Sequence, residues 1–202
     1  LALNAVAPLL CAGVTVWSPL QHFKVKAGDR VGVVGLGGLG HMAVKLASAL
    51  GAEVTLFTTS PAKGEDARRL GAKNVVISRD AAQMADCQAS LDIILDCVAA
   101  PHDLDPYLGA LKTNGQLVLV GIPDQPHPSP NVTPMVFRRL SISGTSIGSI
   151  QETQQMLDFC GQHNITADVE MITGEEVETA FERMLTSDVK YRFVIDMQKT
   201  HW

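Results

Sequence analysis

The sequence predicts an α/β fold, a doubly wound six-stranded parallel sheet with helices on both faces. Short apolar runs recur about every twenty residues with helix-period segments between them, which is typical of successive βαβ units. The first of these runs ends in a Gly35-x-Gly37-x-x-Gly40 turn, and a helix-period segment follows at once. Together these observations predict a Rossmann-type sheet whose ligand lies at the carboxyl ends of the strands.

The six expected strands are Val31–Leu36, Glu53–Thr58, Asn74–Ser78, Leu91–Val98, Gln116–Gly121 and Leu140–Gly144. The helices expected between them are Leu39–Leu50, Pro61–Leu70, Ala81–Ala89 and His102–Leu111. Pro61 suits a first helical turn, whereas Gly51, Gly71 and Gly115 stand where helices should end. The run Pro123–Pro134 holds five of the ten prolines and predicts an irregular surface loop.

Beyond the sixth strand the chain continues further than a nucleotide-binding sheet requires. We expect a helix at Ile150–His163, an extended piece at Thr166–Ile172, a helix at Glu175–Thr186 and a strand at Tyr191–Met197. This tail is predicted to belong partly to a second domain.

The glycine turn is of the kind that binds the pyrophosphate of a dinucleotide. Gly35 permits a tight turn, Gly37 lets the backbone approach a pyrophosphate, and Gly40 allows close packing of helix on strand. The diphosphate would lie on the N–H groups and the positive dipole end of the helix that starts near Leu39.

The end of the second strand indicates which dinucleotide is bound. An NAD-binding strand normally ends there in Asp or Glu, but this chain places Thr58, Thr59, Ser60 and Lys63 there. Hydroxyl donors and an ammonium would accept a 2′-phosphate that a carboxylate would repel, which favours NADP(H) over NAD(H). The alternative is an ordinary Ser-Pro helix start with a solvated Lys63. Glu53 lies at the wrong end of the strand to substitute.

Composition excludes several classes of partner. The net charge of −5 argues against nucleic acid, and no apolar run reaches membrane-spanning length. Four scattered cysteines without a CxxC pair suit a reducing, cytoplasmic setting. The opening residues lack a secretory signal and start within an apolar, helix-like segment, so we expect the start at Leu1 to be a cut.

With these motifs in place, the chain resembles the zinc-dependent medium-chain alcohol dehydrogenases, specifically the cinnamyl-alcohol-dehydrogenase-like aldehyde reductases. The resemblance runs over essentially the whole sequence. It is carried by Pro8-Leu-Leu-Cys-Ala-Gly-Val-Thr15, the Gly35–His41 turn, Ser143-Gly-Thr-Ser-Ile-Gly148, Glu152-Thr-Gln-Gln-Met-Leu-Asp-Phe-Cys160 and Ser187-Asp-Val-Lys-Tyr-Arg-Phe-Val-Ile-Asp196.

The resemblance implies that Cys11 is a catalytic zinc ligand and that Thr15, one helical turn later, lies beside the nicotinamide. From the residues alone, Cys11 would be a core residue and Thr15 a hydroxyl bonded to its own helix backbone. In the family, a first domain supplies the other catalytic zinc ligands and the proton relay. Because one thiolate cannot hold a catalytic zinc, we expect no bound catalytic metal in this chain.

The resemblance also assigns further residues to the cofactor. They are the turn backbone at Leu36, Gly38 and Leu39, the 2′-phosphate pocket at Thr58, Thr59, Ser60 and Lys63, and Cys97, Thr145, Ser146 and Arg192. Cys97 could equally be a small buried hydrophobe, and Arg192 an ordinary surface charge. His41 is expected to cap or pack. His22, His102, His127, His163 and His201 show no ligand-like spacing and are expected at the surface.

The implied organisation has three parts. Residues 1–23 form an inter-domain helix with the zinc-ligand cysteine, residues 24–164 the NADP-binding domain, and residues 165–202 the C-terminal part of the catalytic domain. Without the first domain, the C-terminal part is expected to expose apolar surface that favours self-association. The edge strand Leu140–Gly144 is the candidate surface for a homodimer.

Three functions follow as hypotheses. The first is the cofactor-binding part of an NADP-dependent zinc alcohol dehydrogenase that interconverts small alcohols and aldehydes, inactive as this chain alone. The second is an NADPH-binding module without turnover. The third is a zinc-free quinone reductase of the same superfamily, against which Cys11 and its flanking residues argue.

Overall fold

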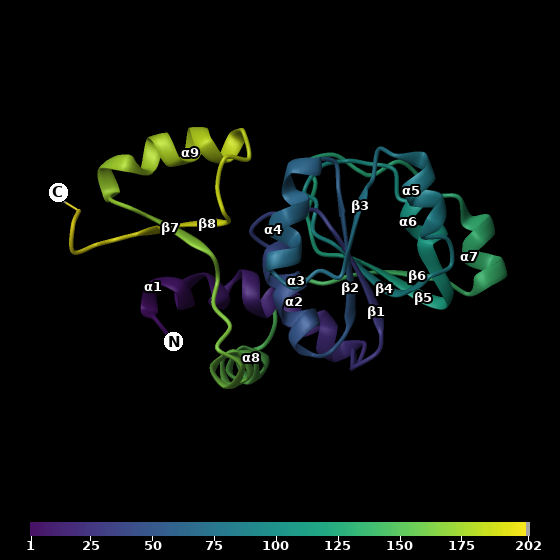
Figure 1. Cartoon of the computed structure of the whole chain (residues 1–202), viewed down its shortest axis with the longest axis horizontal. Helices are drawn as coiled ribbons and strands as arrows, with labels where there is room; N and C mark the ends of the chain where they lie inside the picture. The colour runs from purple at the N-terminus through teal and green to yellow at the C-terminus, as the bar shows by residue number, and fades with distance from the viewer. Residues whose placement is uncertain (201–202) are drawn as a thin grey trace.

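A computed structural model describes residues 1–200 and confirms the predicted fold class (Figure 1). Six parallel strands form one sheet in the order β3-β2-β1-β4-β5-β6. The strands are β1 (Arg30–Val34), β2 (Glu53–Thr58), β3 (Asn74–Ile77), β4 (Leu91–Asp96), β5 (Leu111–Leu119) and β6 (Ser141–Gly144). The strand order reverses between β1 and β4, which is where doubly wound sheets bind their ligands.

Helices cover both faces of the sheet and enclose two apolar cores. On one face lie α2 (Ala12–His22), α3 (Gly40–Ala49) and α4 (Gly64–Arg69), with α8 (Ile150–His163) packed on α2. On the other lie α5 (Ala81–Asp86), α6 (Asp105–Ala110) and α7 (Val132–Arg138). Because both faces are covered, β1 and β2 are buried along almost their whole length, as parallel strands require.

Three local predictions are corrected. The helix expected at His102–Leu111 begins only at Asp105, and Gly115 does not end it but lies inside β5. The reason is pairing: Leu111 already pairs with Leu91, so the chain enters the sheet directly after α6, with a register shift before Gln116.

The loop expected at Pro123–Pro134 is irregular only in its first part, because α7 begins at Val132. Asn131 caps that helix by accepting a hydrogen bond from the Thr133 N–H at 3.0 Å. Pro134 lies in the first turn, where a missing N–H costs nothing. Pro134 predicted a loop, but a proline is equally compatible with the first turn of a helix.

The chain after α8 forms a small unit beside the main sheet (Figure 1). It consists of β7 (Val169–Ile172), the 3-10 turn η3 (Gly174–Glu176), α9 (Val177–Leu185) and β8 (Arg192–Ile195), and β7 pairs with β8 in parallel. The N-terminal α1 (Leu3–Val6) and the 3-10 turn η1 (Ala7–Leu10) lie next to it, and the Ala167 N–H donates to the Ala5 carbonyl at 3.1 Å.

This unit exposes the apolar surface that was expected of it. The exposed large apolar residues of β7, α9, β8 and the segment after β8 are Met171, Phe181, Met184, Leu185, Ile195 and Met197. Their exposure leaves the predicted self-association open to test. His201 lies outside the described residues.

Within residues 1–200, no single helix is long and apolar enough to cross a membrane. The bent pair Leu3–Leu10 and Ala12–His22 passes a length and composition test only when both helices are taken together. Most of the second helix is buried in the protein core.

An ion-pair network holds the C-terminal unit to α3 and α4. The Asp168 carboxylate accepts from Lys45 Nζ and from Arg69, each at 2.6 Å. Arg69 also pairs with Asp66 at 2.7 Å, and the Tyr191 hydroxyl donates to Asp66. Burial opposes ionisation of both carboxyls, but these donors outweigh it and hold the pKa of Asp66 and Asp168 below the ordinary value.

His41 lies buried at the centre of this network and packs, as expected. Its Nδ1–H donates to the Gly37 carbonyl at 3.1 Å, Nε2 accepts from the Asp168 N–H at 3.4 Å, and its ring stacks on Tyr191. Burial, with a smaller contribution from Lys45, lowers the pKa of His41 to about 4. The imidazole is therefore neutral in the folded protein.

We predict that His41 makes the stability of the chain depend on pH. Between the ordinary pKa of 6.5 and the folded pKa of about 4, only the unfolded imidazole takes up a proton. The free energy of unfolding should therefore fall by about 2–3 kcal/mol from pH 7 to pH 4.5. Urea unfolding at both pH values measures it, and His41→Gln should flatten the dependence. An equally steep fall in this variant would contradict the assignment.

Candidate functional site

The glycine turn lies where the strand order reverses, between the ends of β1 and β4. Gly35 follows β1 with a left-handed φ of +85°, and its N–H donates to the Phe57 carbonyl at 2.9 Å. A Cβ at Gly40 would overlap the Gly35 carbonyl, whereas a Cβ at Gly37 would meet no atom within 4 Å. The geometry thus supports the predicted roles of a tight turn, an open approach and a close helix contact.

A pocket of 330 Å³, here called the turn pocket, opens in front of this turn. Its walls come from the turn, from the ends of β2 and β4, and from the C-terminal unit, and they include Leu36, Gly37, Gly38, Leu39, Lys63, Cys97, Tyr191 and Arg192. Helix α3 begins here without a side-chain cap. The positive end of its dipole therefore faces the pocket.

Arg192 contributes a positively charged side chain to the turn pocket. Its guanidinium lies over Gly38, where any Cβ would overlap it. Its Nε is buried without a hydrogen-bond partner among the described residues. A buried cationic donor with an unused N–H beside a helix N-terminus suits a pyrophosphate, so the residues present fit a dinucleotide.

A second, smaller pocket of 210 Å³ adjoins the first at Leu36 and Lys63 and is here called the β2-end pocket. Thr58, Thr59, Ser78, His102 and Tyr107 are among its lining residues. Lys63 Nζ donates to the Leu36 carbonyl at 3.0 Å, which holds the ammonium between the two pockets. Ser60 lies beside this pocket without lining it, and its N–H donates to Thr58 Oγ1 at 3.1 Å.

Neither pocket is lined by a carboxylate from the described residues. Glu53 lies at the opposite end of β2 and pairs with Lys73. Two cations, Lys63 and Arg192, therefore face the combined pockets, and no described carboxylate lines either pocket, although the whole chain carries a net charge of −5. This local charge suits an anionic ligand that carries a pyrophosphate and one further phosphate group.

Cys97 follows β4 at the edge of the turn pocket and is half-buried. Burial raises the pKa of its thiol above the ordinary value, with a smaller contribution from Asp96. The side chain is therefore a neutral wall of the pocket and not a nucleophile.

Thr145 and Ser146 follow β6 and line neither pocket. Their loop packs instead on α2, where a Cβ at Gly148 would overlap Val14, and Ser18 donates to Glu152 at 2.7 Å. The structure thus places this loop against the helix that carries Thr15, which is itself buried.

Cys11 is exposed between η1 and α2 and lines a third pocket of 350 Å³. Arg192 lines this pocket too, so it connects the Cys11 thiol with the turn pocket. Within the described chain, no other cysteine, histidine or carboxylate lines the Cys11 pocket. A catalytic zinc needs three protein ligands, so these residues do not form a zinc site by themselves.

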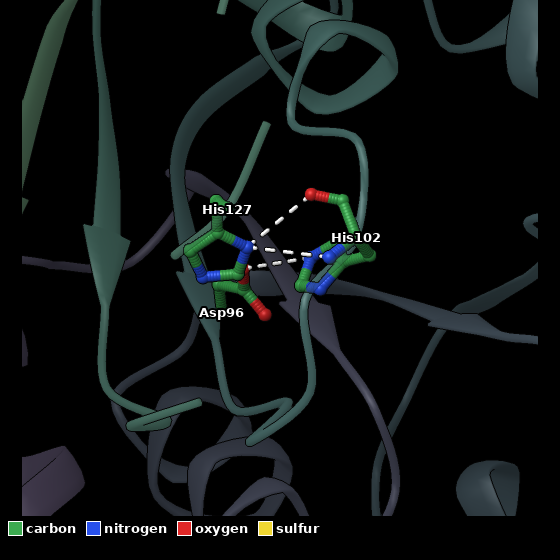
Figure 2. Close-up of side chains that lie close together, drawn as sticks. All are labelled: Asp96, His102 and His127. Carbon is green, nitrogen blue, oxygen red and sulfur yellow. Dashed lines mark hydrogen bonds and ion pairs between the residues drawn. The ribbon is translucent and has the colours of Figure 1, made fainter. Parts of the chain in front are cut away.

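Asp96, His102 and His127 form a cluster of possible metal ligands that the sequence did not indicate (Figure 2). His102 and His127 were expected to be separate surface residues, but the fold brings both half-buried side chains to the buried Asp96 at the end of β4. His102 Nε2 lies 2.9 Å from Asp96 Oδ2. Sequence spacing could not reveal this cluster because it joins a strand end to two irregular loops.

The fold and the two pockets define this chain as an α/β protein of the dinucleotide-binding class. Residues 38–162 match the zinc-binding dehydrogenase family. The chain belongs to this family.

Similar proteins agree with this assignment. The chain is 57% identical over 194 residues to aldehyde reductase YahK of Escherichia coli, covering 96% of this chain and 56% of that protein. It is 52% identical over 202 residues to cinnamyl alcohol dehydrogenase 7 of Arabidopsis thaliana, covering 99% and 56%. The chain thus spans little more than half the length of these relatives.

Solved structures show the same arrangement. A cinnamyl alcohol dehydrogenase of Sorghum bicolor superposes with a TM-score of 0.96 at 47% identity, covering 100% of this chain and 57% of that one. A Helicobacter pylori cinnamyl alcohol dehydrogenase complexed with NADP(H) superposes with a TM-score of 0.89 at 41% identity, covering 99% and 57%.

We predict that substitutions at two glycines of the turn have different effects, one on the stability of the fold and the other on cofactor binding. Gly40→Ala should destabilise the fold by about 1–3 kcal/mol, because its Cβ meets the Gly35 carbonyl. Gly37→Ala should leave the melting temperature unchanged but weaken NADPH binding at least tenfold, because its Cβ enters the space of the pyrophosphate. Thermal unfolding and calorimetric titration measure both, and full NADPH affinity in Gly37→Ala would contradict the assigned pocket.

Proposed function

We propose that this chain is the cofactor-binding part of an NADP(H)-dependent oxidoreductase that interconverts small alcohols and aldehydes. The observation that carries the proposal is the pair of adjoining pockets, with Arg192 at one, Lys63 between them and no acid at the end of β2. The names of the relatives, aldehyde reductase and cinnamyl alcohol dehydrogenase, support the reaction class.

The binding mode follows from the two cations. The turn at Gly37 and Gly38 and the start of α3 would hold the pyrophosphate, and Arg192 would donate to it. Lys63, with the hydroxyls of Thr58 and Thr59, takes the 2′-phosphate. Ser60 supports this turn through its backbone.

The nicotinamide half would be held on the side of the turn pocket that faces Cys11, because Arg192 lines both this pocket and the Cys11 pocket. Cys97 lines the turn pocket. In this proposal Thr15, Thr145 and Ser146 come from the helix and loop beside the nicotinamide. When bound, NADPH supplies the hydride, and the role of this chain is to hold and orient it.

Cys11 provides at most one ligand to a catalytic zinc, so we assign zinc chemistry only to a longer protein that completes the site. We also propose the division into three parts. Residues 1–23 are the linking helix, residues 24–164 the cofactor domain, and residues 165–202 part of a catalytic domain. We also propose a cytoplasmic protein, supported by four free cysteines, and a homodimer through the edge strand β6.

The choice of NADP(H) over NAD(H) can be tested at Lys63. Lys63→Ala should weaken NADPH binding on the order of tenfold or more and change NADH binding little, because only NADPH carries the 2′-phosphate. Lys73→Ala is the matched control, since Lys73 pairs with Glu53 at the far end of β2. Calorimetric titration with both cofactors measures the effect, and equal losses for NADPH and NADH would exclude this pocket.

The limit of the chain's own activity can be tested by assay. We expect the 202-residue chain to bind NADPH but to reduce aromatic aldehydes at no measurable rate, with or without added Zn²⁺, because Cys11 lacks partner ligands. Steady-state absorbance of NADPH measures the rate. Turnover at ordinary enzyme rates, on the order of 1–1,000 per second, would contradict the proposal that this chain binds the cofactor but does not catalyse the reaction alone.

A further inference from the structure

The cluster of Asp96, His102 and His127 has the composition of a metal site and lies outside the proposed catalytic centre. Its three potential ligand atoms all lie within 4.8 Å of one another. Figure 2 shows the two imidazole rings and the carboxylate converging from three segments, the end of β4 and the loops after β4 and β5. Two histidines and one carboxylate form a common ligand set for Zn²⁺ and similar divalent metals.

The Asp96 carboxylate is the central group of this cluster. It is 1% exposed, and its Oδ1 accepts the Val98 N–H at 3.1 Å. Its Oδ2 points at His102 but has no hydrogen-bond partner of suitable geometry among the described residues, and neither has His102 Nε2. A buried carboxylate oxygen with an unused lone pair is costly unless a cation approaches it.

The tautomer of His102 determines which group faces the Asp96 carboxylate. Its Nδ1 lies 2.8 Å from the Ala100 carbonyl, which can only accept, so Nδ1 carries the proton. In the neutral ring, Nε2 then presents a lone pair to Asp96 Oδ2 at 2.9 Å. Two facing lone pairs repel each other unless a proton or a metal ion lies between them.

Two features of the cluster favour a metal ion over a shared proton. Two atoms bound at about 2.0–2.1 Å to one tetrahedral Zn²⁺ stand roughly 3.3 Å apart, so Asp96 Oδ2 and His102 Nε2, which are 2.9 Å apart, would separate by about 0.4 Å to hold the ion. His127 brings a third potential ligand atom within 4.8 Å of the other two, which a shared proton does not need. The Ala100 carbonyl orients His102 as second partners orient metal-binding histidines.

We propose that Asp96, His102 and His127 bind a divalent transition metal ion such as Zn²⁺, with a fourth position open to water. The ion would tie the loops after β4 and β5 to the sheet. Because His102 also lines the β2-end pocket, the ion would stiffen the wall of that pocket. This site is separate from Cys11, which lies in a different pocket.

The test uses the full chain in a Cys11→Ser background, so that the exposed thiol does not bind the probe. After removal of metals with a chelator, calorimetric titration with Zn²⁺ alone should show one site. Adding His127→Gln should weaken Zn²⁺ binding at least tenfold, because even the loss of an outer partner costs that much. Adding His163→Gln, an exposed histidine on α8, should change nothing. Absence of Zn²⁺ binding, or equal binding in the His127→Gln protein, would overturn the proposal.

Two further readouts remain decisive if His127→Gln folds poorly. Zn²⁺ should raise the melting temperature of the Cys11→Ser protein and of its His163→Gln derivative, but not of an Asp96→Asn derivative that keeps the side-chain shape. Co²⁺ should give the visible bands of nitrogen and oxygen ligation. A thiolate charge-transfer band would instead place the metal on a cysteine and refute the site.

Discussion

The approach of helix α3 to the turn after β1 is the constraint on which the rest of the molecule depends. Gly40 must lack a Cβ because the Gly35 carbonyl occupies that position. One helical position further, His41 donates to the Gly37 carbonyl and stacks on Tyr191. Tyr191 is followed directly by Arg192, whose guanidinium lies over Gly38. The turn, its helix and the C-terminal unit are therefore positioned by one set of contacts.

The distribution of charge separates structural from binding cations. Lys45 and Arg69 are neutralised by Asp168 and Asp66 and hold the C-terminal unit in place. Lys63 and Arg192 face the pockets without a carboxylate partner among the residues that line them. Partly buried cations of this second kind cost free energy in the absence of an anion, and that cost is a reason to expect a ligand there.

Much of the site was predictable because its residues follow strands of a parallel sheet. The carboxyl ends of such strands meet at one edge, so the Gly35–Gly40 turn, Lys63 and Cys97 were expected together and lie together. Helix α7 was missed because Pro134, read as a loop signal, is equally suited to a first helical turn. The Asp96 cluster was missed because His102 and His127 lie in loops, where no periodicity sets the direction of a side chain.

The sequence by itself determined the sheet, the glycine turn and the absence of an acid at the end of the second strand, because these depend on short-range patterns and residue identity. Only the tertiary structure decided that Arg192 joins two pockets, that His41 is neutral and that Asp96 meets two histidines. These features depend on burial and on contacts between segments far apart in the chain. Packing sets both, and hydrophobic periodicity does not encode them.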